Sequence, residues 1–155
     1  MLKKIFLGLL LFFVAIQFVR PAKNISPTPS SADLLANYPA PPEVKRLLAV
    51  ACYDCHSNNT RYPWYSNFEP VAWWLASHVE DGKKHLNFSD FANYPPKRAA
   101  RKLQQCIDEL GDKTMPLPSY RIGHPDARLT DEQSKLLSDW FDDTRERIPN
   151  PDTEK

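Results

Sequence analysis

The sequence predicts a small all-α domain of about four helices behind an N-terminal membrane helix. Three observations favour this class. Apolar residues recur at helical spacing in four segments, no segment alternates as a strand would, and the 155 residues include 15 prolines but only 4 glycines. So few glycines disfavour the tight hairpins of an all-β fold and exclude a glycine-rich phosphate-binding loop. The length suits one domain, and a net charge of +1 without a basic patch gives no indication of nucleic-acid binding.

Residues 1–20 have the layout of a signal or membrane anchor. Lys3 and Lys4 precede a nearly unbroken apolar run over residues 5–19. As a helix this run extends about 22 Å, against roughly 30 Å of hydrocarbon core. No small-x-small cleavage site follows it, and Pro21 stands in that region. We therefore expect a retained anchor that holds the protein on the periplasmic side of the inner membrane. A cleaved signal, leaving a free periplasmic protein, is the alternative, and a buried core helix fits the flanking charges least.

The rest of the chain divides into a tether, a folded domain and a tail. Residues 21–37 are rich in proline and serine, which make a stiff segment with little to pack, although Leu34 and Leu35 could dock. Residues 38–148 are expected to fold, and residues 149–155 to form a disordered tail.

Apolar spacing predicts the first two helices of the domain. The first is expected to begin at Pro42, which suits a first helical turn, with an inward face of Val44, Leu47, Leu48 and Ala51. The second is expected to begin after Pro70 and to end at Gly82, a typical C-terminal cap. Its inward face is predicted to hold Val71, Trp74, Leu75, His78 and Val79.

The last two helices also have recognisable ends. The third is expected from Lys97 to Leu110, with Gly111 after it and an inward face of Ala100, Leu103, Ile107 and Leu110. The fourth begins with a capping box between Thr130 and Gln133 and ends before Pro149. Its inward face is predicted to hold Leu136, Leu137, Trp140 and Phe141.

One motif carries the chemistry: Cys52-Tyr53-Asp54-Cys55-His56, a C-x-x-C-H sequence typical of c-type haem attachment. At a helix end, Cys52 and Cys55 project from one face and can reach both vinyl groups of a porphyrin, while His56 can bind the iron. A dithiol redox site would need a βαβ context, and a zinc site would need further ligands. A disulfide between the two cysteines is a further alternative outside the cytoplasm. We expect one covalent haem c, which agrees with export.

Two residues compete for the second axial position on the iron. Met115 lies in the proline-stiffened segment Thr114–Pro118, and a thioether ligand raises the reduction potential of a haem. His78 is the alternative, although a histidine on an apolar helix face is more often a core residue. A vacant sixth position is the third option. His85 and His124 are interpreted as surface or loop residues.

An aromatic segment after the motif suggests a haem pocket. Large rings could surround a porphyrin and exclude water, or simply fill a small core. The candidates are Tyr62, Trp64, Tyr65 and Trp74, with Arg61 as a propionate partner or a solvated loop residue. Cys106 is the odd cysteine, either a reactive thiol or, as we expect, a buried small apolar side chain.

Several stretches together resemble a known family. They are Cys52–Tyr65, Trp73–His78, Leu86–Ser89, Met115–Leu117 and His124–Thr130. Over about residues 38–145 the chain resembles the small bacterial haem-binding domain family with a single C-x-x-C-H. The resemblance implies one covalent haem, at Cys52, Cys55 and His56, on an exported and often membrane-tethered domain.

The sequence as a whole therefore predicts a small cytochrome-c-like bundle around one covalent haem. No acid–base pair or nucleophile triad is recognisable, so we expect an electron carrier rather than an enzyme. Its function would be single-electron transfer on the periplasmic side, with an unidentified redox partner protein. The alternative is a haem-dependent peroxidase or a gas or redox sensor with a labile sixth ligand.

Overall fold

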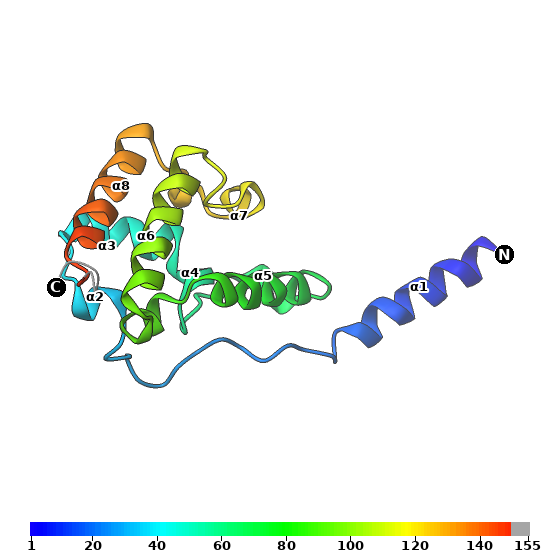
Figure 1. The fold of residues 1–155 in the computed structure, drawn as a ribbon. Helices are drawn as coiled ribbons and strands as arrows, with labels where there is room; N and C mark the ends of the chain where they lie inside the picture. Colours follow the sequence, from blue (N-terminus) through cyan, green and yellow to red (C-terminus); the bar gives the residue numbers. More distant parts are fainter. Residues whose placement is uncertain (150–155) are drawn as a thin grey trace.

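The computed structural model describes residues 1–149, and every regular element in that part is helical (Figure 1). The α-helices are α1 (Leu2–Ile16), α2 (Leu34–Asn37), α3 (Pro42–Ala51), α4 (Tyr53–His56), α5 (Val71–His85), α6 (Pro96–Gly111), α7 (Pro118–Gly123) and α8 (Asp131–Glu146). Three 3₁₀ turns complete the set: η1 (Trp64–Asn67), η2 (Phe88–Asn93) and η3 (Pro125–Ala127). The all-α class is confirmed. The four helices expected in the domain are α3, α5, α6 and α8, and the sequence missed the short ones between them.

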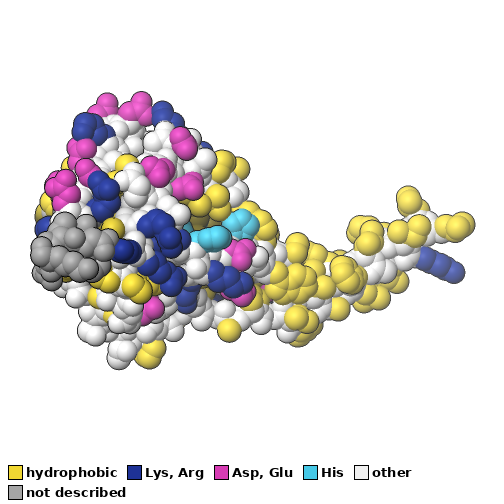
Figure 2. Space-filling model, viewed as in Figure 1, with side chains coloured by type: hydrophobic (Ala, Val, Ile, Leu, Met, Phe, Trp, Pro, Cys, Tyr) yellow, Lys and Arg dark blue, Asp and Glu magenta, His cyan; other side chains and the backbone are white. Residues whose placement is uncertain are grey.

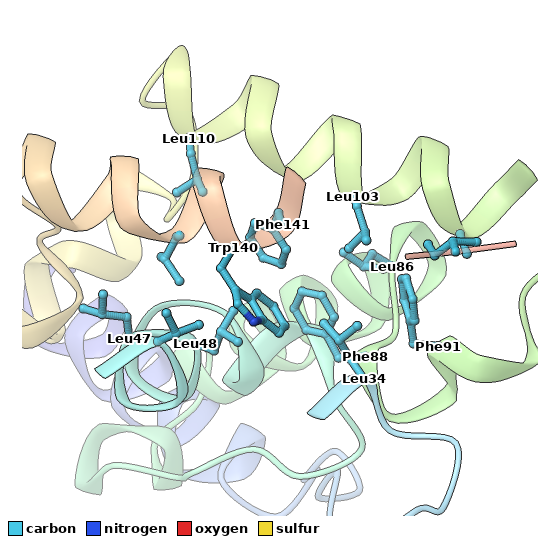
Figure 3. Packing of buried hydrophobic residues seen from close by; sticks show 14 residues of the cluster. Leu34, Leu47, Leu48, Leu86, Phe88, Phe91, Leu103, Leu110, Trp140 and Phe141 are labelled. Carbon is cyan, nitrogen blue, oxygen red and sulfur yellow. The ribbon is translucent and has the colours of Figure 1, made fainter. Parts of the chain in front are cut away.

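The core lies where α6 and α8 run side by side and cover α3 and η2 (Figures 1 and 3). Its buried side chains come from five elements, as Figure 3 shows for Leu34, Leu48, Phe88, Leu103 and Phe141. Each such Leu or Phe contributes about 1.5–3 kcal/mol by leaving water. The predicted capping box is present: Thr130 Oγ1 accepts from Gln133 N at 3.2 Å, and Gln133 Oε1 accepts from Thr130 N at 3.0 Å. The inward faces predicted for α3 and α6 are buried or partly buried.

Two helix faces differ from the prediction. On α5, Ala72, Leu75 and Val79 are buried, whereas Val71 and Trp74 are 38% and 47% exposed. The buried stripe therefore runs along Ala72, Leu75 and Val79 and leaves Val71 and Trp74 beside it. Gly82 does not end α5, which continues to His85. On α8, Leu136 is 39% exposed and the buried set is Leu137, Trp140, Phe141 and Thr144.

The segment expected to be a tether joins the packed domain before residue 38. Leu34 is fully buried in the core cluster, and Asp33 caps α2 by accepting from Leu35 N at 2.9 Å. Further upstream, the Asn24 side chain donates to the Ser57 carbonyl at 2.8 Å. The tail predicted at 149–155 lies outside the described residues except for Pro149.

The N-terminal apolar run is a helix, and every residue of α1 is at least partly exposed. Within residues 1–149, no helix combines the length and apolar character needed to cross a membrane. The anchor over residues 1–20 stays a prediction that this finding does not support.

Candidate functional site

A cavity of about 480 Å³ opens beside the Cys52–His56 motif, between α4, α5, α6, α8 and the α6–α7 loop. Ligand and cofactor pockets commonly have volumes of about 300–1,000 Å³. Five side chains that the sequence singled out line it together: Cys52, Cys55, His56, His78 and Met115. They come from three separate segments between residues 52 and 115, which the fold brings together in one candidate site.

The two motif thiols are presented by a helix break. α3 ends at Ala51, and the Cys52 carbonyl then accepts from Cys55 N at 3.2 Å and from His56 N at 3.0 Å, which starts the single turn of α4. Both cysteines are free thiols and partly buried. Burial raises the pKa of Cys52 to about 12 and that of Cys55 to about 11, so both are neutral at pH 7. Reactive C-x-x-C redox sites instead lower a thiol pKa, which disfavours that interpretation.

His56 is held in one orientation by the backbone of the segment after α5. Its Nδ1 lies 3.0 Å from the Leu86 carbonyl oxygen. A carbonyl can only accept, so we assign the proton to Nδ1, which leaves the lone pair on Nε2. Burial lowers the pKa of His56 and favours the neutral ring. A hydrogen bond from the other ring nitrogen to a carbonyl is how metal-binding histidines are commonly oriented.

Gly82 explains how α5 comes close enough to form this wall. A Cβ at this position would lie 2.7 Å from the Cys55 carbonyl oxygen, a distance that only a glycine avoids. The glycine therefore permits the backbone of α5 to contact α4 directly. Its place inside a helix, where glycine is unfavourable, is accounted for by this close approach.

Asp54, inside the motif, ties α4 to two other segments. It is 5% exposed. Its Oδ1 accepts from Arg61 N at 3.0 Å and from Arg61 Nε at 3.1 Å, and its Oδ2 accepts from Arg61 Nη2 at 3.0 Å and from the Tyr120 hydroxyl at 2.7 Å. Arg61, predicted as a propionate partner, is thus engaged by Asp54. The carboxylate fixes the motif against α7, which follows the Met115 loop.

The two candidate sixth ligands are held differently. The Met115 side chain is 36% exposed, and its backbone N–H donates to the Glu109 carbonyl at 3.3 Å. His78 is partly buried; its Nδ1 lies 2.8 Å from the Trp74 carbonyl, and its ring centroid is 4.3 Å from that of Trp74. A carbonyl can only accept, so in a neutral His78 ring the proton lies on Nδ1 and the lone pair on Nε2.

Comparison with known families decides the class of ligand, since the family described as haem-binding domain matches residues 11–143. The chain belongs to the haem-binding domain family. Comparison with curated proteins and with solved structures gives no match. The family assignment supports haem as the cofactor of this protein and confirms, at the level of the family, the resemblance found in the sequence.

The cavity of this haem-binding domain fits such a group. Apolar and aromatic side chains form much of its wall, as a porphyrin face requires. Thiols and a histidine with a free Nε2 stand on the same wall. Lys102 also lines the cavity, and its ammonium can pair with a propionate in the way expected of Arg61.

The aromatic wall of the haem-binding domain differs from the one predicted. The predicted residues lie outside the cavity wall: Arg61, Tyr62, Trp64, Tyr65 and Trp74. Tyr62 instead accepts from Asn24 N at 2.6 Å, and Trp64 is 76% exposed. The rings on the wall are Phe88, Tyr120 and Phe141. Phe88 and Phe141 also stack on each other, with centroids 6.3 Å apart, so the core continues into the cavity (Figure 3).

Three further residues were predicted to have no part in haem binding: Cys106 as a buried side chain, and His85 and His124 as surface or loop residues. Cys106 is partly buried, as expected, but lines the cavity, and burial raises its thiol pKa well above the usual range. His85 is exposed at the surface, as expected, and also borders the cavity. His124 stacks on Tyr120, with centroids 3.9 Å apart. The helical register of α6 could have pointed to Cys106, because it follows Leu103 by three residues on the inward side.

Proposed function

We propose that this haem-binding protein carries one covalent haem c and passes single electrons on the periplasmic side of the inner membrane. Cys52 and Cys55 are the thioether anchors, and His56 is the proximal ligand. The observation that carries the proposal is that one cavity wall bears both motif thiols and a histidine oriented by the Leu86 carbonyl. Residues 1–20 tether the domain, or are removed to leave it free in the periplasm.

The two motif thiols supply the groups for covalent attachment. Each thiol would add across a vinyl group, forming one S–C bond while its hydrogen goes to the neighbouring carbon, so that no net oxidant or reductant is needed. When bound, haem supplies a reversible one-electron change at its iron. The neutral His56 ring would offer Nε2 to that iron, and Phe88 and Phe141, which line the same cavity, would help to exclude water from it.

Met115 is proposed as the sixth ligand, with His78 as the alternative. A thioether from the proline-flanked loop would raise the reduction potential, as suits an electron carrier. His78 is favoured by its place on the cavity wall and by the contact of its Nδ1 with the Trp74 carbonyl, which in the neutral ring leaves the lone pair on Nε2. The two ligands give different optical spectra, because sulfur and nitrogen ligands perturb the haem iron differently.

The test is to produce the full chain in an exporting host with cytochrome c maturation and to record spectra in both oxidation states, with and without carbon monoxide. Electron transfer predicts a six-coordinate, low-spin haem in both states that binds carbon monoxide poorly. A high-spin haem that binds carbon monoxide readily would contradict this function and support the peroxidase or sensor alternative. Loss of the low-spin signature in His78→Ala, and its retention in Met115→Ala, would assign His78 instead.

A further inference from the structure

Large aromatic side chains are exposed around the amino-terminal end of α5. Trp64 is 76% exposed, Phe68 52%, Trp74 47% and Trp73 37%. We call these four residues the aromatic patch. Trp64 and Phe68 contact each other edge to face, with centroids 6.2 Å apart. A cluster of rings this exposed is typical of an interaction surface.

The end of the apolar helix α1 is hydrogen-bonded to the elements that carry this patch. The Gln17 side chain accepts from Glu69 N at 3.0 Å and donates to the Glu69 carbonyl at 3.2 Å. Trp73 Nε1 donates to the Val19 carbonyl at 2.7 Å. Glu69 itself is 2% exposed, and its carboxylate accepts from Trp73 N at 3.0 Å. The segment that follows α1 is therefore hydrogen-bonded to a part of the domain that is itself held in place by the buried Glu69.

The apolar surface is continuous from the helix to the patch. Figure 2 shows hydrophobic side chains along the N-terminal arm that continue onto the adjoining end of the domain. The exposed side chains of α1 are apolar from Ile5 to Val14, and two cations, Arg20 and Lys23, follow it. Tryptophan is enriched at membrane interfaces, where its ring lies in the apolar layer and its N–H in the polar one. Cations at that level attract anionic head groups.

We propose that the aromatic patch is a membrane-seating surface, which enters the head-group region of a phospholipid bilayer when α1 lies in the lipid. This inference rests on the membrane association in the proposed function. It also orients the domain relative to the membrane. Because the Trp74 ring contacts His78 on the cavity wall, the haem cavity would lie close to the membrane surface.

The test uses the full chain with vesicles of phosphatidylcholine and phosphatidylglycerol, with and without brominated acyl chains. Bromine quenches the fluorescence of only those tryptophans that enter the lipid. Haem quenches equally in brominated and unbrominated vesicles, so the ratio of the two emission intensities reports on bromine alone. The chain has 4 tryptophans, and the fourth, Trp140, is buried at 7% exposure. We expect a loss of emission in the wild type, and none in Trp64→Phe/Trp73→Phe/Trp74→Phe, in which only Trp140 emits.

Leu136→Trp in that triple background is the matched control, because it adds an exposed tryptophan on α8, far from α1 (Figure 1). It should escape quenching. A chain that floats with the vesicles but whose wild-type emission is unchanged by bromine would overturn the patch proposal alone. If the chain then cross-links into dimers in those vesicles, the aromatic patch binds a second copy of this chain and not lipid. A chain that does not float would overturn the membrane association as well, while haem absorbance in the same samples reports on the haem proposal separately.

Discussion

The wall around Cys52–His56 and the loop that carries Met115 differ in how firmly they are held. On the wall, Asp54 is 5% exposed and hydrogen-bonds Arg61 and Tyr120, His56 contacts the Leu86 carbonyl, and Gly82 lets two helices touch. On the loop, the Met115 side chain is 36% exposed. The fold thus preorganises the side proposed for haem attachment, whereas the proposed sixth ligand lies on an exposed loop whose residues Thr114 and Met115 donate backbone hydrogen bonds to the Glu109 carbonyl. Substitutions in the wall should damage the fold, and substitutions at the ligand should change the haem.

The largest effect on stability is expected for Asp54→Asn. The substitution removes the charge that Arg61 and Tyr120 are arranged around, and hydrogen bonds to a charged group are worth about 1.5–3 kcal/mol each. We expect the free energy of unfolding to fall by about 3 kcal/mol, measured by urea titration at neutral pH. Asp139→Asn, which breaks an exposed pair with Lys135, is the control and should cost less than about 0.5 kcal/mol. Equal losses in the two variants would contradict the role assigned to Asp54.

Gly82→Ala should come next. The new methyl group would meet the Cys55 carbonyl at 2.7 Å, and backbone cannot move as a side chain can. Forced overpacking of this kind costs about 1–3 kcal/mol. Gly111→Ala, with open space around the added Cβ, should be neutral or slightly stabilising in the same unfolding assay. A Gly82→Ala protein as stable as Gly111→Ala would show that α5 does not press on α4.

Substitutions of the proposed sixth ligands should separate haem chemistry from folding. Met115→Ala and His78→Ala remove partly exposed side chains, so each should change the unfolding free energy of a haem-free chain by less than about 1 kcal/mol. The true ligand should nevertheless convert the low-spin spectrum of the haem-loaded protein to a high-spin one. If both variants keep the low-spin spectrum, neither residue is the ligand.

The smallest effect is a pH dependence due to His56. Burial lowers its pKa in the folded chain below the unfolded value of 6.5. The unfolded state therefore binds the proton more readily, and this contribution to stability is complete above the unfolded pKa and is lost as the pH falls through it. In Cys52→Ser/Cys55→Ser, which cannot attach haem, stability should decline between about pH 7.5 and about pH 5.5. Adding His56→Gln should make that decline shallower, and an unchanged slope would assign it to other groups.

Local signals predicted much of this fold, and long-range contacts account for what they missed. The capping box at Thr130, Pro42 at the start of α3 and the C-x-x-C-H spacing are each decided within a few residues. By contrast, the buried face of α5 depends on the close approach at Gly82, which no periodicity contains. The exposed Trp74 fits an apolar stripe as well as a buried leucine would, because spacing does not distinguish core rings from surface rings.

The candidate site was likewise predictable only where it depends on local sequence. The motif residues and Met115 could be named because of their types and spacing. The pocket rings could not, since Phe88 and Phe141 come from segments that meet only when η2 packs under α8. The ion pair between Arg61 and Asp54 was not predicted, because Asp54 occupies one of the two unspecified positions of the C-x-x-C-H motif.

Covalent haem attachment is tested most directly by haem staining after denaturing electrophoresis, together with intact mass. The chain should be produced with cytochrome c maturation as wild type, Cys52→Ser/Cys55→Ser and Cys106→Ser, the last a control thiol on the same cavity. If Cys52 and Cys55 attach the haem, it should stay on the wild type and on Cys106→Ser with the mass of one haem, and be absent from the double variant. Haem lost from the denatured wild type, or retained by Cys52→Ser/Cys55→Ser, would contradict it.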